Sequence, residues 1–387
     1  MTLLLCIIYL GFVALGLPDS LFGAAWPVLQ PQMDVPLAWA GFVTVTISGG
    51  TILASLLSDR LTFRFGAAKV TACSVVATAV ALLGFSKATQ FWMLVAWAVP
   101  LGLGAGAVDA ALNNFVALHF SSRHMSWMHC FWGLGASVSP YIMGFFLSRE
   151  LRWDRGYLTV GLIQLALSAV LFASLPLWKK ASALETQEEA RTAPKTLRQI
   201  AALPGICYVL FGFFAYCALE AVAFTWTSTY LVNVRALAPE SAARFASLFY
   251  LGMTVSRFLA GFIADRLGDR KMIRLGFFVC FTGLLLVMLP VSAPLPCLVG
   301  LTVAGFGCGP VYPSIIHATP TVFGKENSQA VVGVQMASAY CGSTFMPPVF
   351  GWVAGAFGLR LFPFALVLFA VVGFTLTELL NRKVKTS

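Results

Sequence analysis

Long apolar runs, separated by short polar breaks, follow one another along the whole of this chain. Many reach about 20 residues, the length that an α-helix needs to cross a hydrocarbon layer of roughly 30 Å. Strands of a membrane barrel would be about 10 residues long and would alternate apolar with polar side chains, a pattern that the sequence lacks. We therefore predict an all-α membrane protein with twelve transmembrane helices, near residues 3–29, 37–57, 70–86, 91–118, 125–148, 155–178, 204–232, 242–264, 272–290, 296–319, 327–356 and 359–381.

Composition and charge agree with a multi-pass protein. Of the 387 residues, 59% are hydrophobic and 10% charged, whereas soluble chains are roughly 25% charged. The net charge of +10 does not indicate a nucleic-acid partner, because Lys and Arg are concentrated in one set of alternate loops and the tail, for example at Arg60, Lys179 and Arg382. This bias predicts a plasma membrane location (the inner membrane in a bacterium) with both termini cytoplasmic.

The first apolar run lacks a preceding basic segment and an obvious small-residue cleavage site, so we expect a retained helix and not a signal peptide. The nine cysteines are scattered through apolar runs, with no C-x-x-C pair and no His/Cys cluster at metal-ligand spacing. We expect them to be small core residues. The sequence predicts no metal site and no cofactor.

Two halves of the chain repeat each other at an offset of about 205 residues. Asp59-Arg60-Leu61 returns as Asp265-Arg266-Leu267, and the alternating glycines of 102–106 return in 305–309. Pro140 and Gly144 return as Pro347 and Gly351. A polar stretch between the sixth and seventh spans indicates a linker. We therefore predict two pseudo-symmetric six-helix bundles, 1–178 and 204–387, joined by a cytoplasmic linker at 179–203 and related by an axis along the membrane normal.

Ionisable side chains inside the spans are few: Asp19, Asp109, His129, Glu220 and Arg257. Because a charge in hydrocarbon costs several kcal/mol, each is a functional hypothesis. We expect Asp19 and Glu220 to line a solute path and to be candidates for proton coupling. Asp109 is the best candidate for a protonatable switch. His129 could relay a proton or be a structural residue, and Arg257 could act in gating or simply hold helices together.

Other polar and aromatic side chains lie near these charges. Asn113 follows Asp109 by one helical turn, so its amide could share a solute hydroxyl with the carboxyl group. Trp26, Trp132, Trp226 and Tyr230 could stack on a sugar ring, although many aromatic residues of a membrane protein are interfacial anchors.

Gly and Pro cluster inside particular spans, at Gly16-Leu17-Pro18, Gly309-Pro310 and Pro347-Pro348. Such clusters break or bend helices, and freed backbone groups are tolerated only beside protein or a watery cavity. These sites are therefore predicted hinges.

The segment from Gly261 to Lys271, with Asp265-Arg266 followed by Gly268-Asp269-Arg270, resembles the loop signature of the major facilitator superfamily. Asp59-Arg60 resembles an eroded first-half copy, in which Ser55 stands where glycine is expected. The resemblance implies the major facilitator fold. It also implies gating roles for the signature charges, namely Asp265, Arg266 and Arg270, and for Asp59 and Arg60 of the first-half copy.

A few short patches give a narrower resemblance to the fucose:proton symporter family and its bacterial relatives. They are Asp109 with Asn113, the segment from Met128 to Gly135 followed by Pro140, and Glu220 with Trp226 and Tyr230. This likeness implies that Asp19 and Asp109 act in solute binding and proton coupling. Fucose carriers have Glu at the position of Asp109, one methylene longer. Residues 135–144 also resemble a motif of drug:proton antiporters.

The leading hypothesis is a secondary transporter that carries a sugar or similar small polar solute together with protons by alternating access. It would act as a monomer in the lipid bilayer and catalyse no covalent chemistry. The chain lacks a phosphate-binding loop of the G-x-x-x-x-G-K-[ST] type, which argues against ATP drive. An exporter of drugs or metabolites is the alternative within transport, and a non-transporting solute sensor or scaffold is the alternative of another class. A membrane enzyme is the weakest hypothesis, because the polar residues include neither a nucleophile with its base nor a metal cluster.

Overall fold

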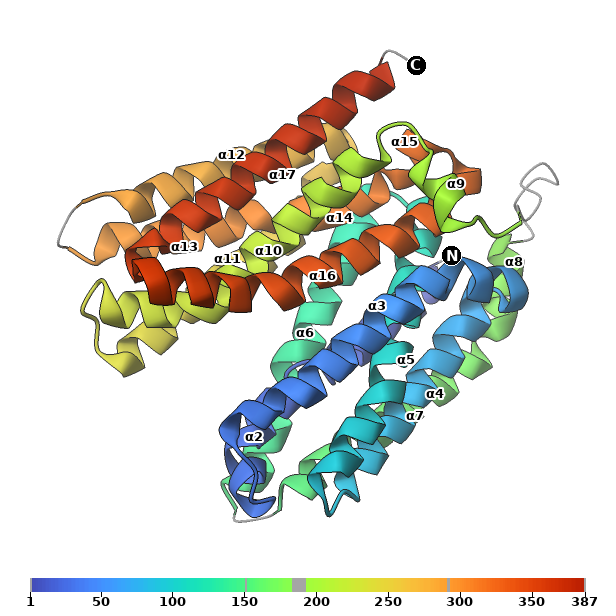
Figure 1. Cartoon of the computed structure of the whole chain (residues 1–387). Coiled ribbons are helices and arrows are strands. Elements are labelled where there is room, and N and C mark those ends of the chain that lie inside the picture. Colours follow the sequence, from blue (N-terminus) through green and yellow to red (C-terminus); the bar gives the residue numbers. More distant parts are fainter. Residues whose placement is uncertain (1, 150–151, 183–192, 291–292, 386–387) are drawn as a thin grey trace. The chain divides into compact units, whose positions relative to one another are not determined.

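The computed structural model describes residues 2–149, 152–182, 193–290 and 293–385, and within them the chain is helical with no strand. Figure 1 shows these helices in chain order. They are α1 (Thr2–Gly16), α2 (Leu21–Gln32), η1 (Leu37–Trp39), α3 (Ala40–Phe65), α4 (Ala67–Ser86), α5 (Phe91–His119), α6 (Ser122–Leu147), α7 (Trp153–Ala173), α8 (Leu175–Ser182), α9 (Leu197–Ala201), α10 (Ile206–Asn233), α11 (Pro239–Leu267), α12 (Asp269–Met288), α13 (Leu295–Cys308), α14 (Val311–His317), α15 (Thr319–Phe323), α16 (Lys325–Phe357), η2 (Leu359–Leu361) and α17 (Phe362–Lys385).

The predicted all-α membrane fold is confirmed, and each predicted span coincides with helix. Most ends agree to within a few residues, but α3 continues to Phe65, well past the predicted end at residue 57. Among the described residues, eleven helical segments are long and apolar enough to cross a membrane. The predicted span at 327–356 corresponds to α16, whose 33 residues would also cross. That helix falls short in hydropathy because polar side chains such as Ser328, Gln329 and Gln335 recur along it.

Two of the three predicted Gly/Pro breaks interrupt helices. α1 ends at Gly16 and α2 begins at Leu21, so a turn holding Asp19 divides the first span. In the tenth span α13 ends at Cys308 and α14 begins at Val311, on either side of Gly309-Pro310. Pro347 and Pro348, by contrast, lie inside the continuous α16. The two broken helices therefore leave backbone N–H and C=O groups that must form hydrogen bonds with other parts of the protein or with water.

The chain forms two compact units, and each includes a segment from the other half of the sequence. Unit 1 comprises Met1–Phe115, Met128–Lys195 and Glu326–Ala337, and unit 2 comprises Val116–Trp127, Thr196–Lys325 and Ser338–Ser387. All of these boundaries except that between Lys195 and Thr196 thus fall inside α5, α6 or α16. The division of the sequence at 179–203 stays a prediction, and residues 183–192 of that linker lie outside the described residues.

In unit 1, α4 lies alongside α7 (Figure 1), and glycines bring α5 against its neighbours. A Cβ added at Gly102 would lie 2.2 Å from the carbonyl oxygen of Ile47 on α3, and one at Gly106 would lie 2.2 Å from that of Thr51. The intervening Gly104 faces α4, where a Cβ would lie 2.7 Å from the carbonyl oxygen of Ser74. These approaches are too close for any other residue.

Unit 2 repeats this arrangement with the second glycine triplet. A Cβ on Gly305 would lie 2.1 Å from the carbonyl oxygen of Phe249 on α11, and one on Gly309 would lie 2.7 Å from that of Met253. Gly307 faces α12, where a Cβ would lie 2.2 Å from the backbone nitrogen of Cys280. α12 also lies alongside α13 and α17 (Figure 1). The repeated glycines therefore pack equivalent helices of the two sequence halves in the same way.

Candidate functional site

Asp19 lies at the break in the first span, where α1 and α6 meet through glycine. Its carboxylate is exposed and accepts a hydrogen bond from the indole Nε1 of Trp132 on α6, at 2.7 Å. A Cβ on Gly16 would lie 2.1 Å from the carbonyl oxygen of Trp132, so only glycine allows this approach. The Gly16-Leu17-Pro18 break thus places a carboxylate beside an aromatic ring, both accessible to a ligand.

Asp109, Asn113 and His129 form a buried hydrogen-bonded chain in unit 1. They are 3%, 0% and 5% exposed, respectively. The Asn113 amide donates to the Asp109 carboxylate at 2.8 Å, and its oxygen lies 3.0 Å from His129 Nε2, which donates to it. The ring of Phe12 on α1 packs edge-on against His129, with centroids 5.1 Å apart. This chain joins a carboxyl group to an imidazole, two groups that can each hold a proton.

The two acids of unit 1 also affect each other. Asp109 lies close enough to Asp19 for the two carboxylates to interact electrostatically. Two carboxylates that are both ionised repel each other.

Glu220 and Arg257 form an ion pair in unit 2, between α10 and α11. Arg257 Nη2 donates to Glu220 Oε1 at 3.0 Å. The arginine side chain is 6% exposed, whereas that of the glutamate is 18% exposed. The glutamate is therefore the more accessible member of the pair.

Three tyrosines that were not predicted interact electrostatically with Arg257. Tyr216 precedes Glu220 by one turn and donates to the carbonyl oxygen of Cys308 at 2.7 Å, which satisfies a group released where α13 ends. Tyr250 and Tyr312, both half-buried, interact electrostatically with Arg257. Tyr216 and Tyr250 share helix faces with Glu220 and Arg257, a spacing visible in the sequence. The position of Tyr312 depends on tertiary packing.

Three predicted stacking residues lie in packed surroundings. Trp26 is 7% exposed and packs on Phe22 and Phe91. The indole of Trp226 donates to the carbonyl oxygen of Pro347 at 3.0 Å. Tyr230 is 2% exposed and accepts a hydrogen bond from Arg235 at 3.2 Å. Their role as solute contacts stays a prediction. Of the four predicted stacking residues, Trp132 is the one that is accessible and hydrogen-bonded to an acid, Asp19.

The predicted gating acids bind backbone N–H groups. Asp59 accepts from the backbone of Lys195 at 2.9 Å. Asp265 accepts from the backbone of Arg123 at 3.0 Å, in the first turn of α6, and pairs with its guanidinium at 3.1 Å. A carboxylate there is favoured by the helix dipole. Arg60 and Arg266 are exposed.

A neighbouring cluster in unit 2 was also missed by sequence reasoning. His317 Nδ1 lies 2.7 Å from the Asp269 carboxylate, and Nε2 lies 3.0 Å from the carbonyl oxygen of Phe120. Asp269 also accepts from the hydroxyl of Ser122 at 2.6 Å. His317 stands alone in its span in the sequence, and only the fold shows its partners.

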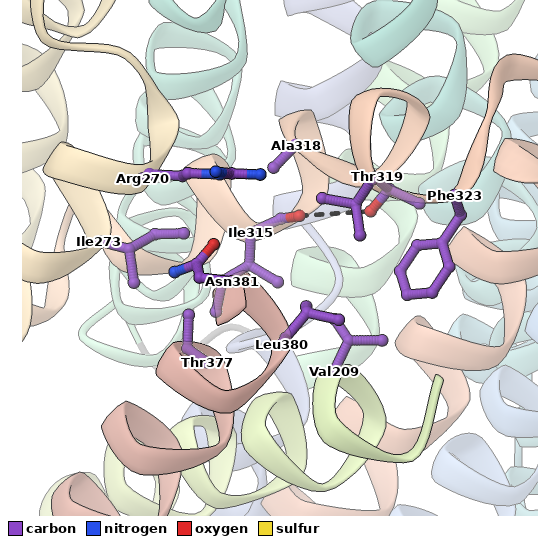
Figure 2. Close-up of a pocket in the computed structure, with 11 residues that line it drawn as sticks. Val209, Arg270, Ile273, Ile315, Ala318, Thr319, Phe323, Thr377, Leu380 and Asn381 are labelled. Carbon is purple, nitrogen blue, oxygen red and sulfur yellow. Dashed lines mark hydrogen bonds between the residues drawn. The ribbon is translucent and has the colours of Figure 1, made fainter. Parts of the chain in front are cut away.

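Unit 2 contains a small pocket of about 30 Å³, room for on the order of two water molecules. Figure 2 shows Arg270 and Asn381 on its wall, together with the hydrogen bond from the Thr319 hydroxyl to the Ile315 carbonyl oxygen. Of the predicted site residues Arg270 lines this pocket, and none of the solute-binding candidates does. Its size is insufficient for a sugar.

Comparison with known proteins identifies relatives over nearly the whole chain. The family model described as Major Facilitator Superfamily matches residues 8–293 and 236–385. The Saccharomyces cerevisiae protein named Bypass of stop codon protein 6 is 24% identical, over 91% of this chain and 77% of that protein. The glucose/mannose transporter GlcP of Bacillus subtilis is 23% identical, over 70% of this chain and 68% of its own.

Solved structures give the same fold. The proton:xylose symporter XylE, bound to 6-bromo-6-deoxy-D-glucose, superposes with a TM-score of 0.79 at 13% identity, over 98% of this chain and 95% of that one. A single-residue variant of the Escherichia coli fucose:proton symporter FucP gives a TM-score of 0.75 at 14% identity, over 98% of both chains. At these identities the likeness establishes the fold alone, and it agrees with the fold implied by the sequence motifs.

Proposed function

Because the chain belongs to the Major Facilitator Superfamily and is a multi-pass membrane transporter, not an enzyme, we propose that it couples the movement of protons to that of a sugar or similar small polar solute. It acts as a monomer in the plasma membrane with both termini cytoplasmic. Relatives named for glucose, mannose and xylose support a sugar as the solute.

The observation on which this proposal depends most is the chain Asp109–Asn113–His129. A buried carboxyl group is stable in hydrocarbon when it is neutral or hydrogen-bonded, and Asn113 supplies a donor to its charged form. Proton arrival at Asp109 removes the charge that Asn113 and His129 stabilise, so protonation changes the interactions between α5 and α6. Such a change is what a coupling residue must transmit.

Asp19 and Trp132 provide the accessible part of the proposed site. A carboxylate accepts hydrogen bonds from sugar hydroxyls, and an aromatic face packs on the apolar face of a sugar ring. The electrostatic interaction between Asp19 and Asp109 gives a direct physical link between solute binding and proton binding, because each event changes the charge that the other acid experiences.

The test is uptake by proteoliposomes that contain the purified chain. With an imposed pH gradient, acid outside, we expect a radiolabelled monosaccharide to accumulate, and Asp109→Asn to abolish accumulation while sugar exchange without a gradient persists. Asp154→Asn, an acid in the first turn of α7 that pairs with Arg152, is the matched control. Gradient-driven accumulation that survives Asp109→Asn refutes the coupling role, and absence of any sugar flux refutes the sugar.

A further inference from the structure

The ion pair of unit 2 combines features that a purely structural pair does not need. Among the described residues, Arg257 is the one buried arginine, with 5% of its surface exposed. A cation in hydrocarbon is costly, so the protein must gain something by keeping it. Its partner Glu220 is the more accessible member of the pair. The carboxylate can therefore leave, or be replaced, without the arginine having to move.

The surroundings are suited to a ring-shaped polar solute. Tyr250 and Tyr312 are half-buried and interact electrostatically with Arg257, and Tyr216 holds the broken end of α13 through its bond to Cys308. The rings of Tyr312 and Phe213 pack with centroids 4.7 Å apart, which fixes the orientation of the tyrosine. Tyrosine offers both a face for packing and a hydroxyl for hydrogen bonding.

We propose that Arg257 recognises the carboxylate of an acidic sugar, and that Glu220 occupies the position of that carboxylate in the solute-free protein. This inference rests on the proposed function and specifies its substrate class. Guanidinium groups match carboxylates in geometry and charge, and the bond between Arg257 and Glu220 is the same contact made within the chain.

The need to keep the buried site electrically neutral links this exchange to proton uptake. Before binding, Arg257 and Glu220 together are neutral. When a solute carboxylate replaces Glu220, an additional negative charge enters the site, and leaving Glu220 ionised in a poorly hydrated interior is unfavourable. One proton on Glu220 restores neutrality, with Arg257 paired to the solute. An acidic sugar and one proton therefore enter together, whereas a neutral sugar has no reason to displace the acid.

The experiment compares D-glucuronate and D-galacturonate with their uncharged methyl esters and with D-glucose, by calorimetric titration of the purified full-length chain. We expect each acid to bind at least tenfold more tightly than its ester. Glu220→Gln, which removes the internal competitor's charge, should increase affinity for the acids by at least tenfold. The double variant Arg257→Gln/Glu220→Gln should lose the preference for acids.

The double variant leaves no orphaned buried charge, so it tests the proposal even if Arg257→Gln alone does not fold. Arg235→Gln is the matched control, because Arg235 bonds to Tyr230 and to backbone carbonyl groups and not to Glu220. It should leave the acid-to-ester ratio unchanged.

Equal or tighter binding of the esters or glucose, an unchanged acid preference in the double variant, or loss of that preference in Arg235→Gln would each overturn the assignment of Arg257. These failures are separable from failure of the proposed function. If neutral sugars accumulate in proteoliposomes and the acids neither bind nor compete, only this inference falls. If no sugar of either kind binds or moves, sugar transport itself is wrong.

Discussion

At the scale of single residues, Asn113 links two titratable groups on different helices. Its amide donates to Asp109 and its oxygen receives from His129, so the side chain is used at both ends. Asn can make this link because its planar amide carries both an NH2 donor group and an acceptor oxygen. Neighbouring Asn114 has another role: its oxygen accepts a hydrogen bond from Ser328 of α16.

Replacing Asn113 with Ala should destabilise the protein by about 1–3 kcal/mol, because buried partners lose their hydrogen bonds. It should also alter the pH at which uptake is half-maximal, since Asp109 loses the donor that stabilises its charge. Asn233→Ala is the control, because Asn233 is exposed and donates to the carbonyl oxygen of Thr229, one turn earlier in its own helix. Thermal unfolding of the purified variants measures stability; equal midpoints for the two would exclude a structural role for the Asn113 link.

Trp132→Phe isolates the second contact, because phenylalanine keeps an aromatic face but cannot donate to Asp19. A hydrogen bond to a charged group is worth about 1.5–3 kcal/mol. If Asp19 must be oriented for the solute, we expect the concentration for half-maximal uptake to rise by roughly tenfold or more with little change in folding. Trp92→Phe, at an exposed aromatic position, should leave uptake unchanged. A similar rise in both variants would indicate a general loss of aromatic anchoring.

At the scale of helices, packing in both units depends on glycines at every second position. Gly106→Ala should destabilise the protein by about 1–3 kcal/mol, because its Cβ would lie 2.2 Å from the Thr51 carbonyl oxygen and α5 would have to move away from α3. Gly144→Ala on α6 is the matched control, since among the described residues no atom beyond the neighbouring backbone of its own helix lies within 4 Å of its added Cβ.

Alanine favours a helix over glycine by about 0.8–1 kcal/mol, so Gly144→Ala should be neutral or mildly stabilising. Thermal unfolding midpoints and the amount of folded protein recovered from membranes distinguish the two variants. A tolerated Gly106→Ala would mean that α3 and α5 can separate freely, in disagreement with the close contact.

Helix positions were predictable from sequence, whereas side-chain partners were not. Hydropathy is a property of each segment, so the spans and the breaks at Gly16-Leu17-Pro18 and Gly309-Pro310 could be located without knowledge of the fold. The acids were found because charges in hydrocarbon are rare. Their partners, such as Trp132 for Asp19, lie on other helices, and the pairing depends on which helix faces meet. For the same reason the contacts of Tyr312 and His317 could not be predicted from the sequence.

At the scale of the whole molecule, the two compact units do not coincide with the two sequence halves. Unit 1 includes residues 326–337 from the second half, and unit 2 includes residues 116–127 from the first. The exchanged part of α16 is held in unit 1 by polar contacts, from Ser328 to Asn114 at 2.5 Å and from Gln329 to Ser58 at 3.3 Å. Each sequence half by itself would therefore lack part of a unit.

This exchange predicts how the protein responds to being cut in two. Severing the chain between residues 183 and 192 removes one covalent link and leaves every described contact within the units intact. We expect the two fragments, co-expressed, to assemble and to recover uptake, whereas each fragment alone should be degraded or misfolded because polar groups such as Asn114 and Ser58 lose their partners in α16.

Co-purification of a tagged N-terminal fragment with its partner, followed by uptake measurements, tests this expectation. Ser328→Leu removes the donor to Asn114 and places a bulky group there. A fragment pair carrying this substitution should assemble less well than a pair carrying Ser343→Leu, because the native Ser343 hydroxyl bonds locally, to the carbonyl oxygen of Tyr340. If the N-terminal fragment alone is stable and monodisperse, the α16 segment is dispensable for unit 1, and the two sequence halves are then independent folding units.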